Sequence, residues 1–329
     1  TVELIPLDII NRNRIVGQNV DLGPYEFNDK NLTQTIDLNS TVNLEMIWVE
    51  PGTFTMGSPV TEAGRRPDET EHNVTLTKGF YLGKYEVTQA QYEAVMNGNT
   101  GWLSATPSFF SGYPNRPVEQ VSWDDVQVFL DRLNTQQSSN IPAGWAYVLP
   151  TESQWEYACR AGTTTMYSWG DDINPTHANY NWDGGGSDGN DFKQTRDVGQ
   201  YMANPWGFFD MHGNVWEWTA DWFGTYPSGN TVVDPSGPGL GSHRVIRGGC
   251  WFNDATYLRS ATHYNAFTPP GARSRNVGFR LAYMYVGKRE HTVDLNSSVN
   301  LDMLWVEPGT FTMGSPTTEV GRFGDRESE

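Results

Sequence analysis

The 329-residue sequence has few cysteines, few basic residues and no long apolar run. Its two cysteines cannot build a disulfide framework, so the core must come from side-chain packing. With 39 acidic against 22 basic residues, the formal net charge is −17. Such a chain repels phosphate backbones, and we therefore expect no nucleic-acid partner. No stretch reaches the roughly 20 apolar residues of a membrane-spanning helix, so no membrane span is expected.

Motifs for metal, nucleophile and phosphate chemistry are also missing. The histidines show no HxH, HxxxH or HExxH spacing, which argues against zinc or non-haem iron sites. Neither a GxSxG nucleophile motif nor a phosphate-binding glycine loop occurs. The polar run Asp68, Glu69, Glu71 and His72 predicts a solvated face.

Aromatic and turn-forming residues are abundant instead. The chain contains 13 Trp, 15 Tyr and 15 Phe, together with 34 Gly and 19 Pro. The aromatic side chains have to supply much of the core, and the turn-forming residues argue against a helical bundle. This composition favours an α+β fold with unusually little regular secondary structure.

Three short helices are indicated by capping and periodicity. Thr88 with Gln91, and Thr151 with Gln154, form T-x-x-Q capping boxes, and Ser122 can cap the helix that follows it. The second helix carries an apolar stripe at i, i+3, i+4 and i+7 (Val126, Phe129, Leu130 and Leu133). The third places Trp155, Ala158 and Cys159 on one face, with Gly162 as its expected stop. We expect Cys159 to be a core residue.

An internal repeat divides the chain. Residues 35–65 and 292–322 are identical at 25 of 31 aligned positions. One complete domain is therefore expected at 35–286, followed at 287–329 by a linker and the truncated start of a second copy, which we expect to be poorly ordered or to pack opportunistically. Residues 1–34 resemble the closing segment of bacterial parallel β-helix domains, and a linker is the alternative. Further domains in the same polypeptide are therefore expected.

A series of motifs spans the central domain. These are MIWVEPGTFTMGS (46–58), KYEVTQAQYEAVM (84–96), RPVEQVSWDDVQVFL (116–130), LPTESQWEYACRAG (149–162), NPWGFFDMHGNVWEWTADWF (204–223), RVIRGGCWF (244–252) and NVGFRLA (276–282). In this order they resemble the formylglycine-generating enzyme, or sulfatase-modifying factor, family. That resemblance implies a compact α+β fold related to C-type lectins.

The family enzyme oxidises a sulfatase cysteine with oxygen and copper, which is bound by two cysteines. Thiolates are the ligands that select Cu(I). The resemblance places Asn253 and Leu258 at the two cysteine positions, so copper and formylglycine generation are not expected. Cys250 lies in the same segment, where the family has Ser, and is a weak catalytic candidate.

The segment 244–282 also resembles the variable region of retroelement-diversified proteins, which use the same lectin-like fold. That comparison predicts a buried scaffold that includes Arg247, Arg259 and Arg280. Aromatic residues interleaved with Asn, Thr and His on a glycine-braced loop also have the composition of a binding paratope. The expected ligand-binding residues are Trp218, Trp251, Phe252, Asn253, Asp254, Thr256, Tyr257, His263, Tyr264, Asn265 and Phe267. The alternative is an ordinary polar loop.

The family resemblance further implies two structural calcium sites, because oxygen ligands suit this cation. The first uses the carbonyls of His212, Gly213 and Val215 and the carboxylate of Glu217, for which a Glu–Arg pair is the alternative. The second uses Asn179 and the Tyr180 carbonyl, with an acidic partner that the register leaves open among Asp188, Asp191 and Asp197.

We therefore interpret the chain as a non-catalytic, calcium-braced binding module of a large surface or secreted protein, with an unidentified protein or glycan ligand. An extracellular or cell-surface location follows from that interpretation. An oxidase or other modifying enzyme of the same family is the alternative, and a structural spacer in a tandem array is a third possibility.

Overall fold

The computed structural model describes residues 32–182, 193–226, 231–264 and 268–287 in full. It also describes the backbone of four short strands: β1 (Glu3–Ile5), β2 (Arg14–Val16), β15 (Glu290–Asn296) and β16 (Val299–Leu304). The expected disorder of 290–329 falls largely on residues 305–329, which lie outside the described residues.

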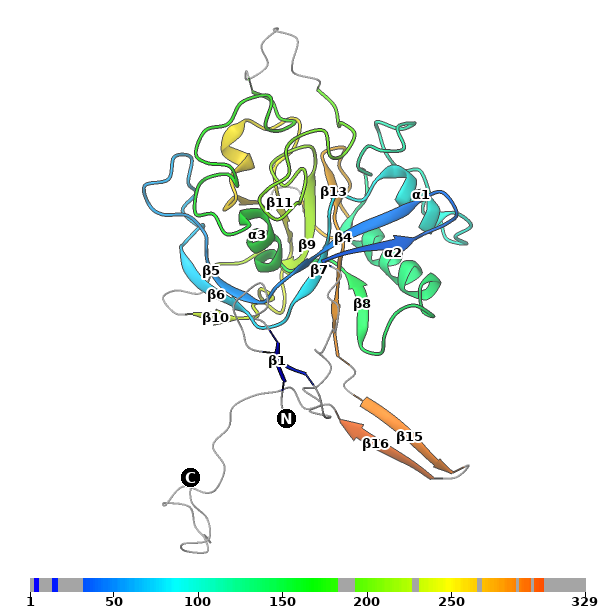
Figure 1. The fold of residues 1–329 in the computed structure, drawn as a ribbon. Coiled ribbons are helices and arrows are strands. Elements are labelled where there is room, and N and C mark those ends of the chain that lie inside the picture. The colour runs from blue at the N-terminus through cyan, green and yellow to red at the C-terminus, as the bar shows by residue number, and fades with distance from the viewer. Residues whose placement is uncertain are drawn as a thin grey trace, which may run out of the picture.

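The largest sheet joins strands from both ends of the domain (Figure 1). Its order is β3 (Thr33–Asp37), β4 (Asn43–Val49), β7 (Phe80–Gly83), β14 (Ala282–Tyr285) and β8 (Trp145–Val148), and every neighbouring pair is antiparallel. The last strand of the described domain, β14, therefore lies inside the sheet between β7 and β8, which come from the first half of the domain.

Two smaller sheets carry the loops of the candidate site. One has the order β12 (His263–Tyr264), β11 (Arg244–Arg247), β9 (Trp216–Trp222) and β13 (Val277–Phe279), with β13 parallel to β9. The other has the order β10 (Val232–Val233), β6 (His72–Leu76) and β5 (Gly52–Met56), with β10 parallel to β6. Mixed sheets with few helices confirm the expected α+β class.

The three predicted helices are confirmed as α1 (Gln89–Met96), α2 (Trp123–Gln136) and α3 (Glu152–Arg160). Each begins with a complete capping box, because the N-cap side chain accepts the N3 backbone N–H and the N3 side chain accepts the N-cap N–H. In α2 the N3 residue is Asp125, a role that the sequence did not reveal. Helix α3 ends at Arg160, where Ala161 adopts the left-handed conformation with φ of 47°.

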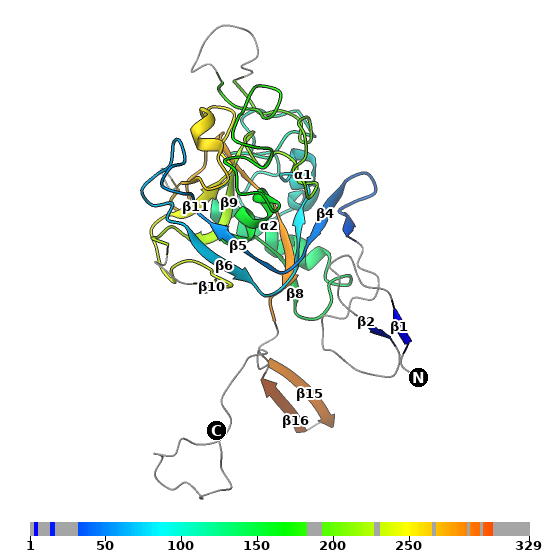
Figure 2. The same ribbon diagram turned by 60° about the vertical axis from the view of Figure 1, so that its left-hand side comes forward.

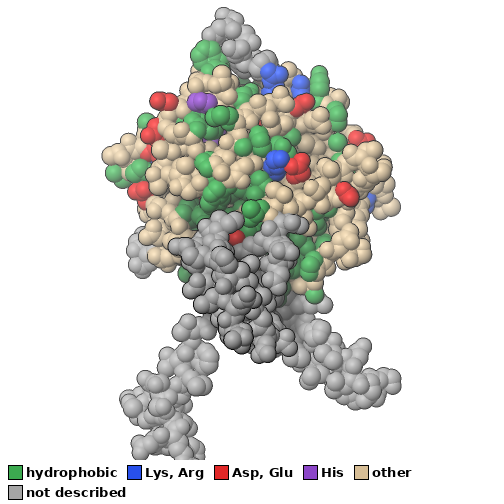
Figure 3. All heavy atoms as spheres, viewed as in Figure 1, with side chains coloured by type: hydrophobic (Ala, Val, Ile, Leu, Met, Phe, Trp, Pro, Cys, Tyr) green, Lys and Arg blue, Asp and Glu red, His purple; other side chains and the backbone are tan. Residues whose placement is uncertain are grey.

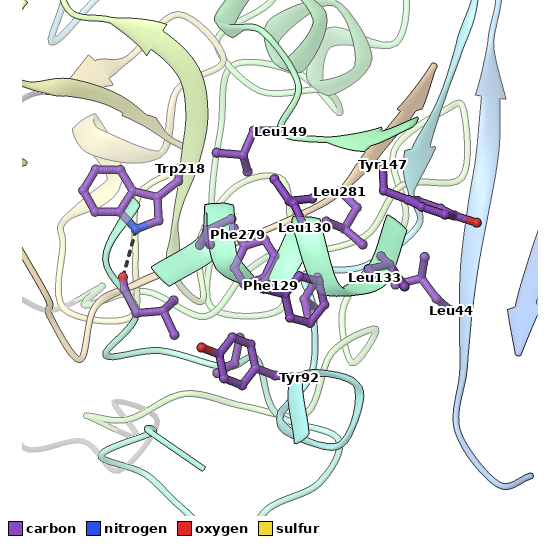
Figure 4. Close-up of a cluster of buried hydrophobic side chains, with 14 of the residues drawn as sticks. Leu44, Tyr92, Phe129, Leu130, Leu133, Tyr147, Leu149, Trp218, Phe279 and Leu281 are labelled. Carbon is purple, nitrogen blue, oxygen red and sulfur yellow. Dashed lines mark hydrogen bonds between the residues drawn. The ribbon is translucent and has the colours of Figure 1, made fainter. Parts of the chain in front are cut away.

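Aromatic and aliphatic side chains from helices and sheets form the main core (Figure 4). The apolar stripe of α2 is buried, with Phe129 stacked on Tyr92 at 5.3 Å and edge-on to Phe279 at 5.2 Å between ring centroids. The Trp218 indole N–H donates to the Val121 carbonyl at 3.0 Å. Cys159 is fully buried in a second cluster with Trp155, which confirms its assignment to the core.

Between α3 and β9 the described residues form no helix and no extended strand. Side-chain hydrogen bonds, rather than strand pairing, fix the conformation of this segment. Asn204, for example, donates through Nδ2 to the Ala158 and Cys159 carbonyls and accepts the N–H groups of Trp206 and Phe208. The expected scarcity of regular secondary structure therefore holds over 163–182 and 193–215, whereas strands β9 to β14 form further along the chain.

The two copies of the repeated sequence pair in the same register. In the first copy Thr35 lies opposite Glu45 and Ile36 opposite Leu44; in the second, Thr292 lies opposite Asp302 and Val293 opposite Leu301. The first hairpin continues into the large sheet through the pairing of β4 with β7, whereas the residues that follow β16 lie outside the described residues. The repeated sequence thus forms the same hairpin in both copies.

On the face seen in Figure 3, basic side chains are few and hydrophobic ones are scattered among polar groups. A search of the described residues finds no helix with the length and apolar character needed to cross a membrane.

Replacing Ser122 with Ala should lower the free energy of unfolding by about 1 kcal/mol, because the Asp125 backbone N–H loses its capping acceptor. Urea denaturation followed by tryptophan fluorescence measures this loss. Ser139→Ala, an exposed serine beyond the end of α2, is the matched control and should leave stability unchanged. Equal effects of the two substitutions would contradict the capping role.

Candidate functional site

The candidate site is built on the segment that follows β11. Gly248 and Gly249 have φ of 95° and 76°, a conformation that favours glycine. A Cβ atom at Gly249 would lie 2.7 Å from Leu258 Cδ1, so this turn approaches the short 3₁₀ helix η1 (Ala255–Leu258) closely. Asp254 caps η1 by accepting the Thr256 N–H at 2.9 Å. The loop is therefore glycine-braced, as predicted.

Several predicted ligand-binding residues reach the surface of this loop. Phe252 is 58% exposed, Asp254 and Thr256 are exposed, and Asn253, Tyr257 and Tyr264 are half-buried. Tyr264 stacks on Trp216 at 5.4 Å between ring centroids, which leaves only part of its ring accessible. Asn265 and Phe267 lie outside the described residues.

Three of the proposed ligand-binding residues are buried, and the structure corrects their assignment. Trp218 and Trp251 are 1% and 3% exposed and belong to the main core. His263 is 1% exposed because the rings of Phe223 and Tyr226 lie against its imidazole. Trp218 lies in β9, His263 in β12 and Trp251 in the turn after β11, and residue type alone does not reveal which of these side chains face the core.

His263 takes part in a buried charge cluster. Its Nδ1 lies 3.0 Å from Glu152 Oε1 and its Nε2 lies 3.5 Å from Asp68 Oδ2. Burial alone would lower the pKa of His263, but the two carboxylates raise it to about 9. The imidazole is therefore a structural cation at neutral pH.

The prediction of a solvated face at Asp68, Glu69, Glu71 and His72 is corrected for Glu69 and His72, whereas Glu71 is exposed. Glu69 is fully buried and accepts hydrogen bonds from both terminal nitrogens of Arg259, at 2.7 and 2.8 Å. His72 is 7% exposed and lies against the Tyr226 ring. A buried carboxylate is expected to have a cationic partner, and here that partner is 190 residues away in the sequence.

Cys250 is a buried thiol that donates to Asn253 Oδ1 at 2.9 Å. Burial raises its pKa to about 12, so the nucleophilic and metal-binding thiolate is scarce near neutral pH. Leu258 is fully buried and packs beside Tyr167 and Tyr180. Burial raises the pKa of Cys159 to about 12 as well.

Glu217, the carboxylate of the first expected calcium site, is paired with an arginine. Its Oε1 and Oε2 accept from Arg280 at 2.7 Å each, and Oε2 also accepts the Trp155 indole N–H at 2.6 Å. Both oxygens therefore already have a donor, so the side chain does not fit the role of a calcium ligand. The Glu–Arg pair, the alternative for this position, is what the structure contains.

The other residues of the first expected calcium site, His212, Gly213 and Val215, also contact protein groups. The His212 ring contacts the Leu258 carbonyl through Nδ1 at 2.7 Å, and burial lowers its pKa to about 4. The backbone N–H of Val215 donates to Glu86 Oε1 at 3.0 Å. A Cβ atom at Gly213 would lie 2.6 Å from the Asn179 carbonyl oxygen, so this glycine permits the two expected calcium loops to touch.

The second expected site is only partly described. Asn179 donates through Nδ2 to the Gln194 carbonyl and to Asn214 Oδ1, which leaves its own Oδ1 without a donor among the described residues. An amide oxygen in that state fits a calcium ligand. Tyr180 is buried nearby, and Asp197 lies 3.9 Å from Arg116. Asp188 and Asp191 lie outside the described residues, so calcium stays a prediction for this loop.

Among the residues that the structure describes, no group of three or more His, Cys, Asp or Glu side chains could hold a metal ion.

The structure adds a second loop to the candidate site. Phe110 lies edge-on to Trp251 at 5.5 Å, and Trp251 lies edge-on to Phe252 at 5.6 Å between ring centroids. Phe109 is 57% exposed, and the Arg275 guanidinium lies 5.4 Å from both the Phe109 and Trp251 ring centroids. We name the exposed side chains of Phe109, Phe252 and Arg275 the aromatic surface.

A buried carboxylate fixes this second loop. Glu119 accepts the backbone N–H groups of Phe109 and Phe110 at 3.1 and 2.8 Å. Burial raises the pKa of Glu119 to about 7, despite these hydrogen bonds and the nearby Arg275. Sequence reasoning missed the loop because Phe109 and Phe252 are brought together only by the fold. The adjacent residues Phe109 and Phe110 were the one available signal.

Comparisons with known proteins identify relatives of this chain in sequence and in structure. A family model described as the sulfatase-modifying factor enzyme 1-like domain matches residues 34–284. The formylglycine-generating enzyme of Mus musculus is 28% identical over 294 residues, an alignment that covers 72% of this chain and 74% of that protein.

Two solved structures share the fold. Treponema denticola variable protein 1 aligns with a TM-score of 0.63 and 26% identity, over 77% of this chain and 99% of that one. PvdO from Pseudomonas aeruginosa aligns with a TM-score of 0.66 and 29% identity, over 78% of this chain and 100% of that one.

His263→Gln should remove a pH-dependent part of the stability. Because the folded state holds the imidazole proton more tightly than the unfolded chain, this contribution is complete below pH 6.5 and is lost as the pH rises through about 9. Its size is up to about 3 kcal/mol for a shift from 6.5 to about 9.

Urea unfolding at pH 6 and pH 9.5 measures the effect. The variant should be less stable than wild type at pH 6 and much closer to it at pH 9.5. His243→Gln, which leaves Glu152 and Asp68 untouched, is the control. A difference between His263→Gln and wild type that does not change with pH would contradict the assignment.

Proposed function

The chain belongs to the sulfatase-modifying factor enzyme 1-like domain family, and within it we propose a non-catalytic ligand-binding module of a larger extracellular or cell-surface protein. The similarity to formylglycine-generating enzymes and to a Treponema variable protein agrees with both resemblances indicated by the motifs. The fold is the C-type-lectin-like fold of that family.

The observation that carries the proposal is the aromatic surface. Phe109 and Phe252 are each more than half exposed, and Arg275 lies over the Phe109 ring. Large rings contribute contact area at a low cost in side-chain entropy, and arginine adds directed hydrogen bonds; both are enriched where binding energy concentrates. Asn253, Asp254 and Thr256 add polar groups beside them.

The support beneath this surface is rigid. Glu119 holds the backbone of the 109–110 loop, and the ring contacts of Trp251 connect that loop to Phe252. Arg259 anchors the far side of η1, because it donates to the Thr256 carbonyl at 2.9 Å and to Glu69. A preformed surface loses little conformational freedom on binding, which favours affinity.

The cysteine environment supports the absence of catalysis. A buried thiol with a pKa of about 12 is a poor nucleophile, and Asn253 and Leu258 stand where the family resemblance expects thiolates. The ligand class stays a protein or a glycan, since aromatic rings with amide and hydroxyl groups suit both.

Incubation with copper, oxygen and a sulfatase-type cysteine peptide should give no aldehyde, as read by mass spectrometry after oxime capture. Wild type and Cys250→Ser should both be inactive, while an active formylglycine-generating enzyme serves as the positive control. Aldehyde formation that Cys250→Ser abolishes would overturn the binding-module proposal in favour of a family oxidase.

The binding function is tested with the double substitution Phe109→Ala/Phe252→Ala, on a defined glycan array and a displayed peptide library. Ligands that bind wild type should lose about tenfold or more in affinity, because two exposed anchor rings are removed. Leu240→Ala, which truncates an 88% exposed apolar residue elsewhere, should retain full binding. Ligands that bind wild type and the double variant equally would contradict the assignment of this surface.

A further inference from the structure

A cavity of about 370 Å³ lies at the end of β9, apart from the aromatic surface. Its walls come from β5, β6 and β10, the start of α3, and residues 224–226 and 235–238. In both ribbon views η1 lies at the upper end of the domain and β10 at the lower end (Figure 1, Figure 2). The volume falls in the range of small-molecule sites.

The cavity walls are mainly apolar. Met56, Trp222, Val232, Pro235 and Pro238 line it. Such surfaces favour the carbon skeleton of a small ligand, while polar lining residues such as His72, Glu152 and Asp221 can fix the ligand's orientation.

Asp221 is the polar group best placed to fix the orientation of a ligand in this cavity. It lines the cavity and is only 3% exposed. Its Oδ2 accepts the Glu152 backbone N–H at 2.7 Å, whereas its Oδ1 accepts no hydrogen bond from the described residues. Gly237 makes the close approach possible, because a Cβ atom there would lie 3.1 Å from Asp221 Oδ1.

The neighbouring charged groups each have at least one partner, although within the described residues Nε of Arg244 and Nε and Nη1 of Arg247 form no hydrogen bond. His72, which also lines the cavity, contacts the Thr70 carbonyl through Nδ1 at 2.9 Å. Glu152 accepts the Tyr226 hydroxyl at 2.6 Å and lies beside the His263 imidazole. Arg247 donates to Glu156, and Arg244 donates to the Ala220 carbonyl at 2.6 Å while it lies between the Trp123 and Trp222 rings. Among the described residues that line the cavity, Asp221 is therefore the carboxyl group without a cationic partner.

We propose that this cavity binds a compact organic cation, an alkylammonium ion whose nitrogen pairs with Asp221 and whose carbon chain lies against the apolar walls. A buried carboxylate needs a cation or a proton, and the cavity has room for the first. The ammonium supplies the hydrogen-bond donor that Oδ1 lacks, and burial of the chain supplies the hydrophobic gain. The strongly acidic chain favours the approach of cations.

Proton release should accompany binding. Burial and the Glu152 carboxylate raise the pKa of Asp221 to about 8, and the backbone N–H of Glu152 and the charges of Arg244 and Arg247 offset this only in part. Without ligand the carboxyl is mostly protonated at pH 7. An ammonium ion binds the ionised form, so its affinity should rise about tenfold per pH unit until the pH reaches about 8.

Isothermal titration calorimetry with n-butylammonium chloride tests this proposal, with 1-butanol as the neutral probe of similar shape. Wild type should bind n-butylammonium more tightly at pH 8 than at pH 6.5. Titrations at pH 7 in phosphate and in MOPS buffers should show close to one proton released per bound cation. Binding of 1-butanol should be weaker and independent of pH.

Asp221→Asn should lower the affinity for n-butylammonium at pH 8 at least tenfold and remove its pH dependence. The amide oxygen can still accept the Glu152 N–H, so the fold is expected to persist. Asp172→Asn, which removes an exposed carboxylate, is the matched control and should bind as wild type does.

Two results would overturn the proposal: n-butylammonium that binds wild type no better than 1-butanol, or equal binding by wild type and Asp221→Asn. The comparison of the two probes needs no variant, so it decides the matter even if Asp221→Asn does not fold. Since Phe109→Ala/Phe252→Ala leaves this cavity untouched, failure here is distinct from failure of the aromatic surface.

Discussion

Buried arginine–glutamate pairs hold this loop-rich fold together. Three fully buried guanidinium groups each pair with a glutamate from a distant segment: Arg247 with Glu156, Arg259 with Glu69, and Arg280 with Glu217. The first two pairs connect segments that are not paired as strands, whereas the Arg280–Glu217 pair adds to the pairing of β13 with β9. A buried charge left without its partner costs several kcal/mol, so these pairs impose one arrangement on segments that hydrophobic contact alone would define loosely. The candidate site depends on them directly, because Arg247 precedes its glycine turn and Arg259 follows its 3₁₀ helix.

Local features of the fold could be predicted from the sequence, and contacts between distant segments could not. The helix caps at Thr88, Ser122 and Thr151 and the buried stripe of α2 depend on residues a few positions apart, and all are present. His263 shows the limit: its residue type suggests a surface ligand, yet two carboxylates from distant segments bind it in the interior. Glu217 likewise could serve calcium or an arginine, and only the position of Arg280 in space decides between them.

The difference between local signals and long-range contacts also explains which parts of the candidate site could be predicted. Phe252, Asp254 and Thr256 reach the surface as predicted, because the paired glycines before them and the cap of η1 are local signals. The loop of Phe109 joins them because Phe110 contacts Trp251 and Phe109 contacts Arg275, each more than a hundred residues away in the sequence, and no sequence pattern marks that proximity. The two hairpins of the repeat pair in matching register, as expected of a feature that depends on residues close together in the sequence.

The glycine-braced turn has a consequence for how sequences of this kind can change. The conformation of 248–258 is set by two glycines, by buried Leu258 and by the pairing of Arg259, all of which lie beneath the surface. The exposed side chains of Phe252 and Thr256 add only a ring contact with Trp251 and a hydrogen bond to Asp254. Mutations at such outward positions are nearly neutral for folding, so many different recognition surfaces are accessible from one backbone. Selection on binding and selection on stability then act on separate sets of codons.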